Sequence, residues 1–173
     1  MNLLFILTAL LTHSYAQPPK KTAVPLKILY FGDSHSVAPL APFGLTMNQL
    51  LRALPNARVE THARCGSTLE WWYTGKPSVC GSYDQNALGK VWKPKNPNSV
   101  ATPKIASILQ GMKPHLIVIE MGGNYLGAYQ PTEKFKTDAA PFLLAVKKLK
   151  TDQNTRCIWV GRPSRRDPEA HLA

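Results

Sequence analysis

Three short apolar segments, each followed directly by a glycine, constrain the fold of this chain more than any other feature of its sequence. The segments and their glycines are 27–31 with Gly32, 115–121 with Gly122, and 156–160 with Gly161. Each is shorter than a typical helix and is rich in apolar residues, which is the pattern of a strand buried in a sheet. A weaker strand is predicted at 58–62.

Helical patterns occupy the stretches between these segments. Apolar residues recur at helical spacing in 44–54, 102–112 and 137–150, and the last of these has lysines opposite its apolar face. Strands that alternate with helices predict an α/β domain, here a three-layer α/β/α sandwich around a mostly parallel sheet. The stretch 75–103 contains four prolines and no periodicity. It is predicted to be a long loop over the edge of the sheet where the strands end.

The first sixteen residues have the composition of a secretory signal. They contain an apolar run at 3–11, no charged side chain, and small residues at the two positions that a signal peptidase reads. The alternative is a buried N-terminal helix. We expect a signal peptide at 1–16, a lead at 17–26 and one domain at 27–173, because this length suits one full hydrophobic core. The mature protein is then secreted or periplasmic, with no stable membrane anchor.

The formal net charge of +11 indicates which partners the surface favours. A basic excess attracts polyanions, and for an exported protein these are anionic envelope polymers or lipid surfaces. The basic residues are scattered along the chain, and the sequence has no zinc-ligand spacing, no RNA-binding aromatic motif and no repeats. Nucleic acid is therefore not an expected partner.

Three cysteines suggest one disulfide bond. In an oxidising compartment Cys65 and Cys80 would close a loop of about 15 residues, a bridge worth about 3 kcal/mol in the chain-entropy model. Cys157 lies in an apolar strand-like run, where a cysteine usually behaves as a small buried hydrophobe. The odd number leaves at least one thiol outside any bridge within the monomer.

The sequence FGDSHS at 31–36 places a serine where the first predicted strand ends. A catalytic serine needs a base that takes its proton and hydrogen-bond donors for the oxyanion that it creates. The alternative is that Asp33 or Ser34 caps the helix that follows. In either case Asp33 is expected to hold the turn and not to serve as the acid of a triad.

Two more turns at strand ends favour the catalytic interpretation of Ser34 over the helix cap. Gly66 follows the weaker strand and allows the backbone to approach a ligand closely. The sequence GGN at 122–124 follows the next strand, and the side chain of Asn124 can donate a hydrogen bond to an oxyanion. Because ligands gather beyond the carboxyl ends of strands in open sheets, Ser34, Gly66 and Asn124 are expected to converge.

This ordered set of motifs resembles the SGNH hydrolases, the GDSL-like esterase and lipase superfamily. GDS at 32–34 matches the nucleophile block, Gly66 the second-block glycine, and GGN at 122–124 the third block. The resemblance covers about 27–163. It implies the flavodoxin-like sandwich of that superfamily and a serine ester hydrolase.

By this resemblance Ser34 would be the nucleophile. The oxyanion hole would consist of the backbone N–H groups of Ser34 and Gly66 and the side chain of Asn124. The reaction would pass through an acyl-serine intermediate. It would need neither a metal nor an organic cofactor, because serine, base and oxyanion donors suffice.

The last motif of the superfamily, a DxxH that supplies the acid and the base, has no good match. Asp167 and His171 form DxxxH, and they follow the strand 156–160 too soon, since the superfamily has a further helix and strand there. We therefore expect a C-terminally shortened domain, with Asp167 and His171 as the alternative acid and base. Tyr125 stands where the superfamily often has aspartate.

The other candidate side chains have weaker claims. His35 is expected to point away from Ser34, His62 to be a satisfied, partly buried histidine, and His115 to open a core strand. The aromatic cluster 71–73 is either a platform for a sugar ring or acyl group, or core packing.

The sequence thus predicts an exported serine esterase that acts on an ester-bearing small molecule or an acylated glycan, such as an O-acetylated envelope polysaccharide. The alternative is a non-catalytic module that uses the same cleft to bind a glycan or a partner. The choice of acetyl group and glycan rests on the predicted compartment and the basic charge alone.

Overall fold

The computed structural model describes residues 24–37, 41–125 and 133–160. The predicted signal peptide at 1–16 and most of the predicted lead lie outside these ranges. Among the described residues, no helix is both long and apolar enough to cross a membrane.

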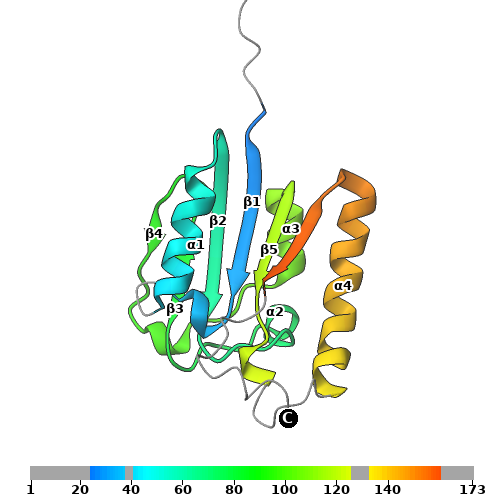
Figure 1. Ribbon diagram of the computed structural model, residues 1–173. Helices are drawn as coiled ribbons and strands as arrows, with labels where there is room; N and C mark the ends of the chain where they lie inside the picture. Colours follow the sequence, from blue (N-terminus) through cyan, green and yellow to red (C-terminus); the bar gives the residue numbers. More distant parts are fainter. Residues whose placement is uncertain (1–23, 38–40, 126–132, 161–173) are drawn as a thin grey trace, which may run out of the picture.

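Six strands form one mixed sheet in the order β4-β3-β2-β1-β5-β6 (Figure 1). The strands are β1 (Leu26–Gly32), β2 (Ala57–Arg64), β3 (Ser82–Gln85), β4 (Val91–Trp92), β5 (Leu116–Glu120) and β6 (Arg156–Val160). Neighbouring strands among β2, β1, β5 and β6 pair in parallel, whereas β3 and β4 add an antiparallel extension beside β2. The four segments that the sequence predicts as strands are therefore neighbours in one sheet, and the α/β class is confirmed.

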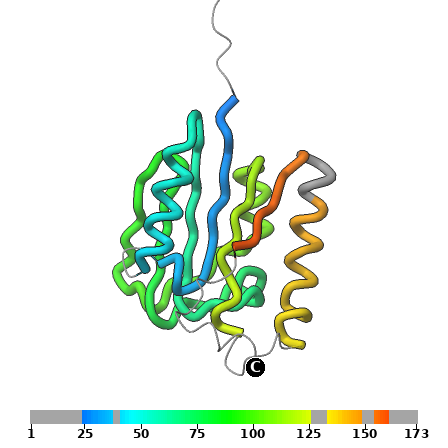
Figure 2. The backbone as a smooth tube through the Cα atoms, viewed as in Figure 1, coloured from blue at the N-terminus to red at the C-terminus, as the bar shows by residue number. Residues whose placement is uncertain are grey.

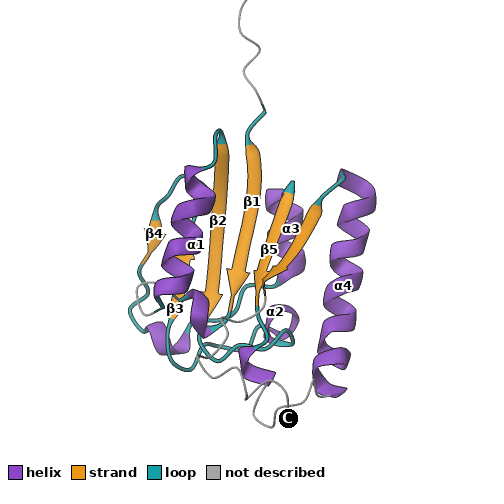
Figure 3. Cartoon of the chain, viewed as in Figure 1, coloured by secondary structure: helices purple, strands orange, loops and turns teal. Residues whose placement is uncertain are grey.

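In the described part of the chain, four α-helices connect and cover the strands (Figure 3). They are α1 (Pro42–Ala53), α2 (Trp71–Thr74), α3 (Ile105–Met112) and α4 (Glu133–Gln153). α1 begins with a proline, whose fixed φ suits the first helical position, and ends just before the next proline in the chain. α3 ends where Lys113 adopts a left-handed conformation, one residue before Pro114.

The two faces of the sheet carry two separate apolar clusters, because side chains alternate along each strand. Leu29 and Phe31 of β1 belong to the larger cluster, which includes residues of α2, α3 and α4. Ile28 and Tyr30 point the other way, and residues of α1 pack on their cluster. Trp72 of α2 is fully buried, and its ring centroid lies 4.8 Å from that of Phe31. Within the aromatic cluster 71–73, the core interpretation therefore holds for Trp72.

The stretch 75–103 differs from its prediction as an irregular loop, because it contains the hairpin of β3 and β4. The two strands have four and two residues, and the hairpin lies along the edge of β2. Polar side chains dominate β3. Short polar strands are stabilised by their pairing with β2 and not by an apolar face of their own, so periodicity in the sequence does not reveal them.

The cysteine predictions have opposite outcomes. Cys65 and Cys80 form a disulfide with their α-carbons 5.1 Å apart, as expected. Cys157, predicted to be buried, is exposed instead. It lies on β6, which is the last strand in the sheet order of the described residues, so its neighbours in the sequence do not enclose it.

Candidate functional site

Three turns meet at the edge of the sheet where β1, β2 and β5 end. In the ladder, Gly32 at the end of β1 pairs with Ala63 of β2 on one side and with Glu120 of β5 on the other. Ser34 opens the 3₁₀ turn η1 (Ser34–Ser36) directly after β1. Gly66 follows β2, and Asn124 lies in the 3₁₀ turn η3 (Gly123–Tyr125) after β5. The three predicted residues are thus placed on turns of adjacent strands.

Hydrogen bonds tie these turns to one another. The backbone N–H of Gly123 donates to Asp33 Oδ2 at 3.2 Å, which joins the turn after β5 to the turn after β1. Asn124 Nδ2 donates to the carbonyl of Ser67 at 2.7 Å, which joins it to the turn after β2. The hydroxyl of Tyr125 accepts the backbone N–H of Leu69 at 2.7 Å. Tyr125 thereby supports the edge of the site.

Three donors at this edge have hydrogen-bonding capacity that the described residues do not use. Within the described residues, no hydrogen bond takes up the backbone N–H of Ser34 or of Gly66. The side chain of Asn124 is exposed, and its amide carries a second N–H besides the one bonded to Ser67. These are the three groups expected to form an oxyanion hole.

Position 66 requires glycine in this structure. Its φ of +84° is a conformation that other residues rarely adopt, and an added Cβ would lie 2.6 Å from the Cγ2 atom of Val79. The same Cβ would lie 3.5 Å from the ring of Trp71, so an aromatic side chain flanks the position.

Asp33 organises the turn that carries Ser34. This side chain is fully buried, and it accepts the backbone N–H of His35 at 3.0 Å as the cap of η1. Asp33 Oδ1 also lies 3.1 Å from His35 Nδ1. His35 therefore pairs with Asp33, and no histidine of the described residues bonds to the hydroxyl of Ser34. The prediction that Asp33 holds the turn is confirmed.

Sequence reasoning missed Glu120, which is fully buried at the end of β5. Its Oε2 accepts the hydroxyl of Ser36 at 2.7 Å, and that hydroxyl lies 2.7 Å from the hydroxyl of Tyr30. Burial raises the pKa of Glu120 to about 7, and the negative charge of Asp33 adds to the effect. The only signal in the sequence is a carboxylic acid at the end of an otherwise apolar strand.

The remaining predicted residues lie away from this edge or outside the described residues. His62 is a satisfied, partly buried histidine, as expected, with Asp84 and Glu60 as its partners. His115 is exposed, and its Nδ1 accepts the backbone N–H of Lys27 at 3.0 Å. Asp167 and His171 lie outside the described residues.

Comparison with known proteins gives no match. No protein-family model, no curated protein and no solved structure is similar enough to this chain to be matched.

Proposed function

We propose that this protein is an SGNH-type serine esterase with a flavodoxin-like α/β/α sandwich fold. The observation that carries the proposal is that Ser34, Gly66 and Asn124 follow β1, β2 and β5 at one edge of the sheet. The apolar clusters on both faces, one with α1 and one with α3 and α4, support the sandwich.

The proposed reaction uses these groups in a fixed order. Ser34 Oγ attacks the carbonyl carbon of the ester, and the oxyanion accepts hydrogen bonds from the N–H groups of Ser34 and Gly66 and from the amide of Asn124. The alcohol leaves, and water then releases the acid from the acyl-serine. A general base must take the proton of Ser34, and His171 with Asp167 is the candidate pair in this chain.

The substrate class follows from charge and compartment. The chain is strongly basic, and its first sixteen residues favour export. We therefore propose an acylated anionic glycan of the cell envelope, with an O-acetyl group as the ester.

Hydrolysis of 4-nitrophenyl acetate tests the proposed reaction. If His171 does not act on Ser34, turnover should be limited mainly to the contribution of binding and the oxyanion hole, about 10³- to 10⁴-fold over water. Loss of one oxyanion donor in Asn124→Ala should lower the rate by about 10²-fold or more. Ser99→Ala, at an exposed loop position, is the matched control and should not change it.

The base is tested in the same assay. If His171 acts on Ser34, then His171→Ala and Ser34→Ala lower the rate equally, and mass spectrometry of the parent shows an acetyl group on Ser34. If it does not, His171→Ala leaves the rate unchanged, which is the result we expect. If the parent protein hydrolyses the ester no faster than Asn124→Ala does, the proposal of an esterase is refuted.

A second candidate function is binding without turnover. The observation that favours it is that the hydroxyl of Ser34 has no histidine partner among the described residues. A protein of this kind would bind acetylated glycan fragments in calorimetry and release them unchanged, and Asn124→Ala would weaken that binding.

A further inference from the structure

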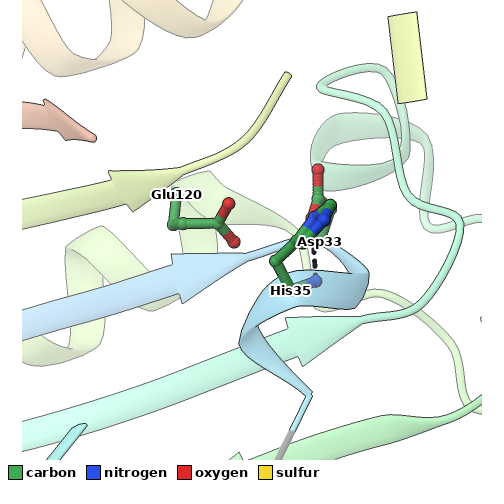
Figure 4. Close-up of side chains that lie close together, drawn as sticks. All are labelled: Asp33, His35 and Glu120. Carbon is green, nitrogen blue, oxygen red and sulfur yellow. Dashed lines mark hydrogen bonds and ion pairs between the residues drawn. The ribbon is translucent and has the colours of Figure 1, made fainter. Parts of the chain in front are cut away.

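A compact group of ligand-type side chains lies next to the candidate nucleophile. Asp33 caps η1, His35 lies within it, and Glu120 comes from the end of β5 (Figure 4). One potential ligand atom from each of the three lies within 4.8 Å of the other two. Asp33 and Glu120 are fully buried, whereas the side chain of His35 is 43% exposed, which leaves the group accessible on one side.

The charges of this group are incompletely compensated. Glu120 Oε1 is buried and has no hydrogen-bond partner within the described residues. Figure 4 shows the carboxyl group of Glu120 facing Asp33 and His35. In the described part of the chain, no lysine or arginine forms an ion pair with either carboxylate. Two buried carboxylates beside a single imidazole are costly unless a cation or a proton compensates them.

We propose that Asp33, His35 and Glu120 bind one divalent transition-metal cation. Carboxylate oxygen and imidazole nitrogen are ligands that suit Zn²⁺, Mn²⁺ and Co²⁺, whereas Ca²⁺ takes six to eight oxygen ligands. Ligands about 2.0–2.2 Å from a metal lie about 3–3.6 Å apart at octahedral or tetrahedral angles. Because the three atoms lie within 4.8 Å of one another, the side chains must close by up to about 1–2 Å when the ion binds.

The surroundings hold the two carboxylates in place for such an ion. Ser36 donates to Glu120 Oε2, which leaves the other oxygen of Glu120 facing the group. Gly123 donates its N–H to Asp33 Oδ2. Hydrogen bonds of this kind orient the ligands in known metal sites. On binding, the ion takes the place of the proton between His35 Nδ1 and Asp33 Oδ1, which lie 3.1 Å apart.

Glycine at position 123 is part of this arrangement. An added Cβ there would lie 3.2 Å from Cε1 of His35 and 3.3 Å from Oδ2 of Asp33. Both ligand side chains thus pack directly against the backbone of η3. None of the proposed ligands is an oxyanion donor or the nucleophile, although Asp33 also caps the turn that carries Ser34.

The test is metal binding by purified protein without a polyhistidine tag. We expect calorimetry with Zn²⁺ and Mn²⁺, and the visible spectrum with Co²⁺, to show one strongly bound ion per chain. The ion should also raise the melting temperature, because it binds the folded state alone. Glu120→Gln and His35→Ala should each weaken binding at least about tenfold.

Matched controls separate this site from binding by surface side chains. Glu70→Gln removes another carboxylate, one that pairs with Lys76 and Lys134, and His115→Asn removes an exposed histidine. Neither should change the affinity. If Glu120→Gln fails to fold, His35→Ala carries the test, because its side chain is partly exposed. Absence of binding at millimolar metal, or equal affinity in the parent and His35→Ala, would overturn the proposal.

Discussion

His62 fixes the β3–β4 hairpin to β2 through a charged contact that can be removed by one substitution. Its Nδ1 lies 2.7 Å from Asp84 Oδ1 on β3, and its Nε2 lies 2.9 Å from Glu60 Oε1. The side chain of His62 is only 15% exposed. Since both nitrogens face carboxylates, both must carry a proton for the two hydrogen bonds to form.

Replacement of His62 by leucine should destabilise the protein by about 2–4 kcal/mol at pH 6. Two hydrogen bonds to charged groups contribute about 1.5–3 kcal/mol each, and Asp84 keeps the bidentate contact with Arg64 in the variant, which limits the loss. Glu60 is 27% exposed, so in the variant water can replace the hydrogen bond that His62 made with its carboxylate. The free energy of unfolding from urea titrations, followed by tryptophan fluorescence, measures the difference.

The destabilisation caused by His62→Leu should become smaller as pH rises. Burial alone would lower the pKa of His62, but the hydrogen bonds to Asp84 and Glu60 outweigh burial and raise it. A group whose pKa is higher in the folded state contributes its full stabilisation below the unfolded pKa, about 6.5 for histidine. It loses that stabilisation as pH rises through the folded pKa.

Urea titrations at several pH values between about 5.5 and 9, the range in which histidine ionises, give the difference in unfolding free energy between the parent and the variant as a function of pH. His115→Asn, at an exposed histidine, is the matched control variant. A His62→Leu variant that costs less than about 0.5 kcal/mol, or a difference that grows with pH, would show that the reasoning is wrong.

Four further changes test the fold. Replacing Cys65 and Cys80 together by serine should lower the free energy of unfolding by about 3 kcal/mol, and a reducing agent should abolish the difference from the parent. Gly44→Ala places a Cβ 2.4 Å from the backbone of η1 and should cost more than about 1 kcal/mol. Gly111→Ala meets nothing within 4 Å and should gain up to about 1 kcal/mol by helix propensity in the same denaturation assay. Phe142→Ala removes a fully buried ring and should lower stability by about 3–5 kcal/mol by urea denaturation.

The strands of the central sheet were predictable because each depends mainly on its own residues. An apolar run that ends at a glycine predicts β1, β5 and β6. Each of these strands lies within about one residue of its predicted ends, at 27–31, 115–121 and 156–160. The strands β3 and β4 were missed because they are stabilised by pairing along β2, which no local pattern records. Cys157 was predicted wrongly for a related reason. Its apolar neighbours indicate a strand but not the position of that strand in the sheet.

The residues of the candidate site also include some that the sequence could predict and one that it could not. Ser34, Gly66 and Asn124 could be placed because strand ends and turn residues are visible in the sequence, and parallel strands bring such ends together. Glu120 could not be placed, because its burial depends on Ser36, which is 84 residues away in the chain. A carboxylic acid at the end of a strand ordinarily indicates solvent contact.

The central position of β1 in the sheet has a consequence for how the protein folds. β1 is the first described strand in the chain, yet it lies between β2 and β5, as Figure 2 shows, and its second ladder closes a loop of 88 residues between Lys27 and His115. Pairings over such sequence distances slow folding, because loop entropy is lost before contacts form. Until α3 and then α4 are synthesised, Phe31 and Leu29 lack the helices that cover them. A nascent chain of this protein therefore presents an apolar strand to chaperones for most of its synthesis.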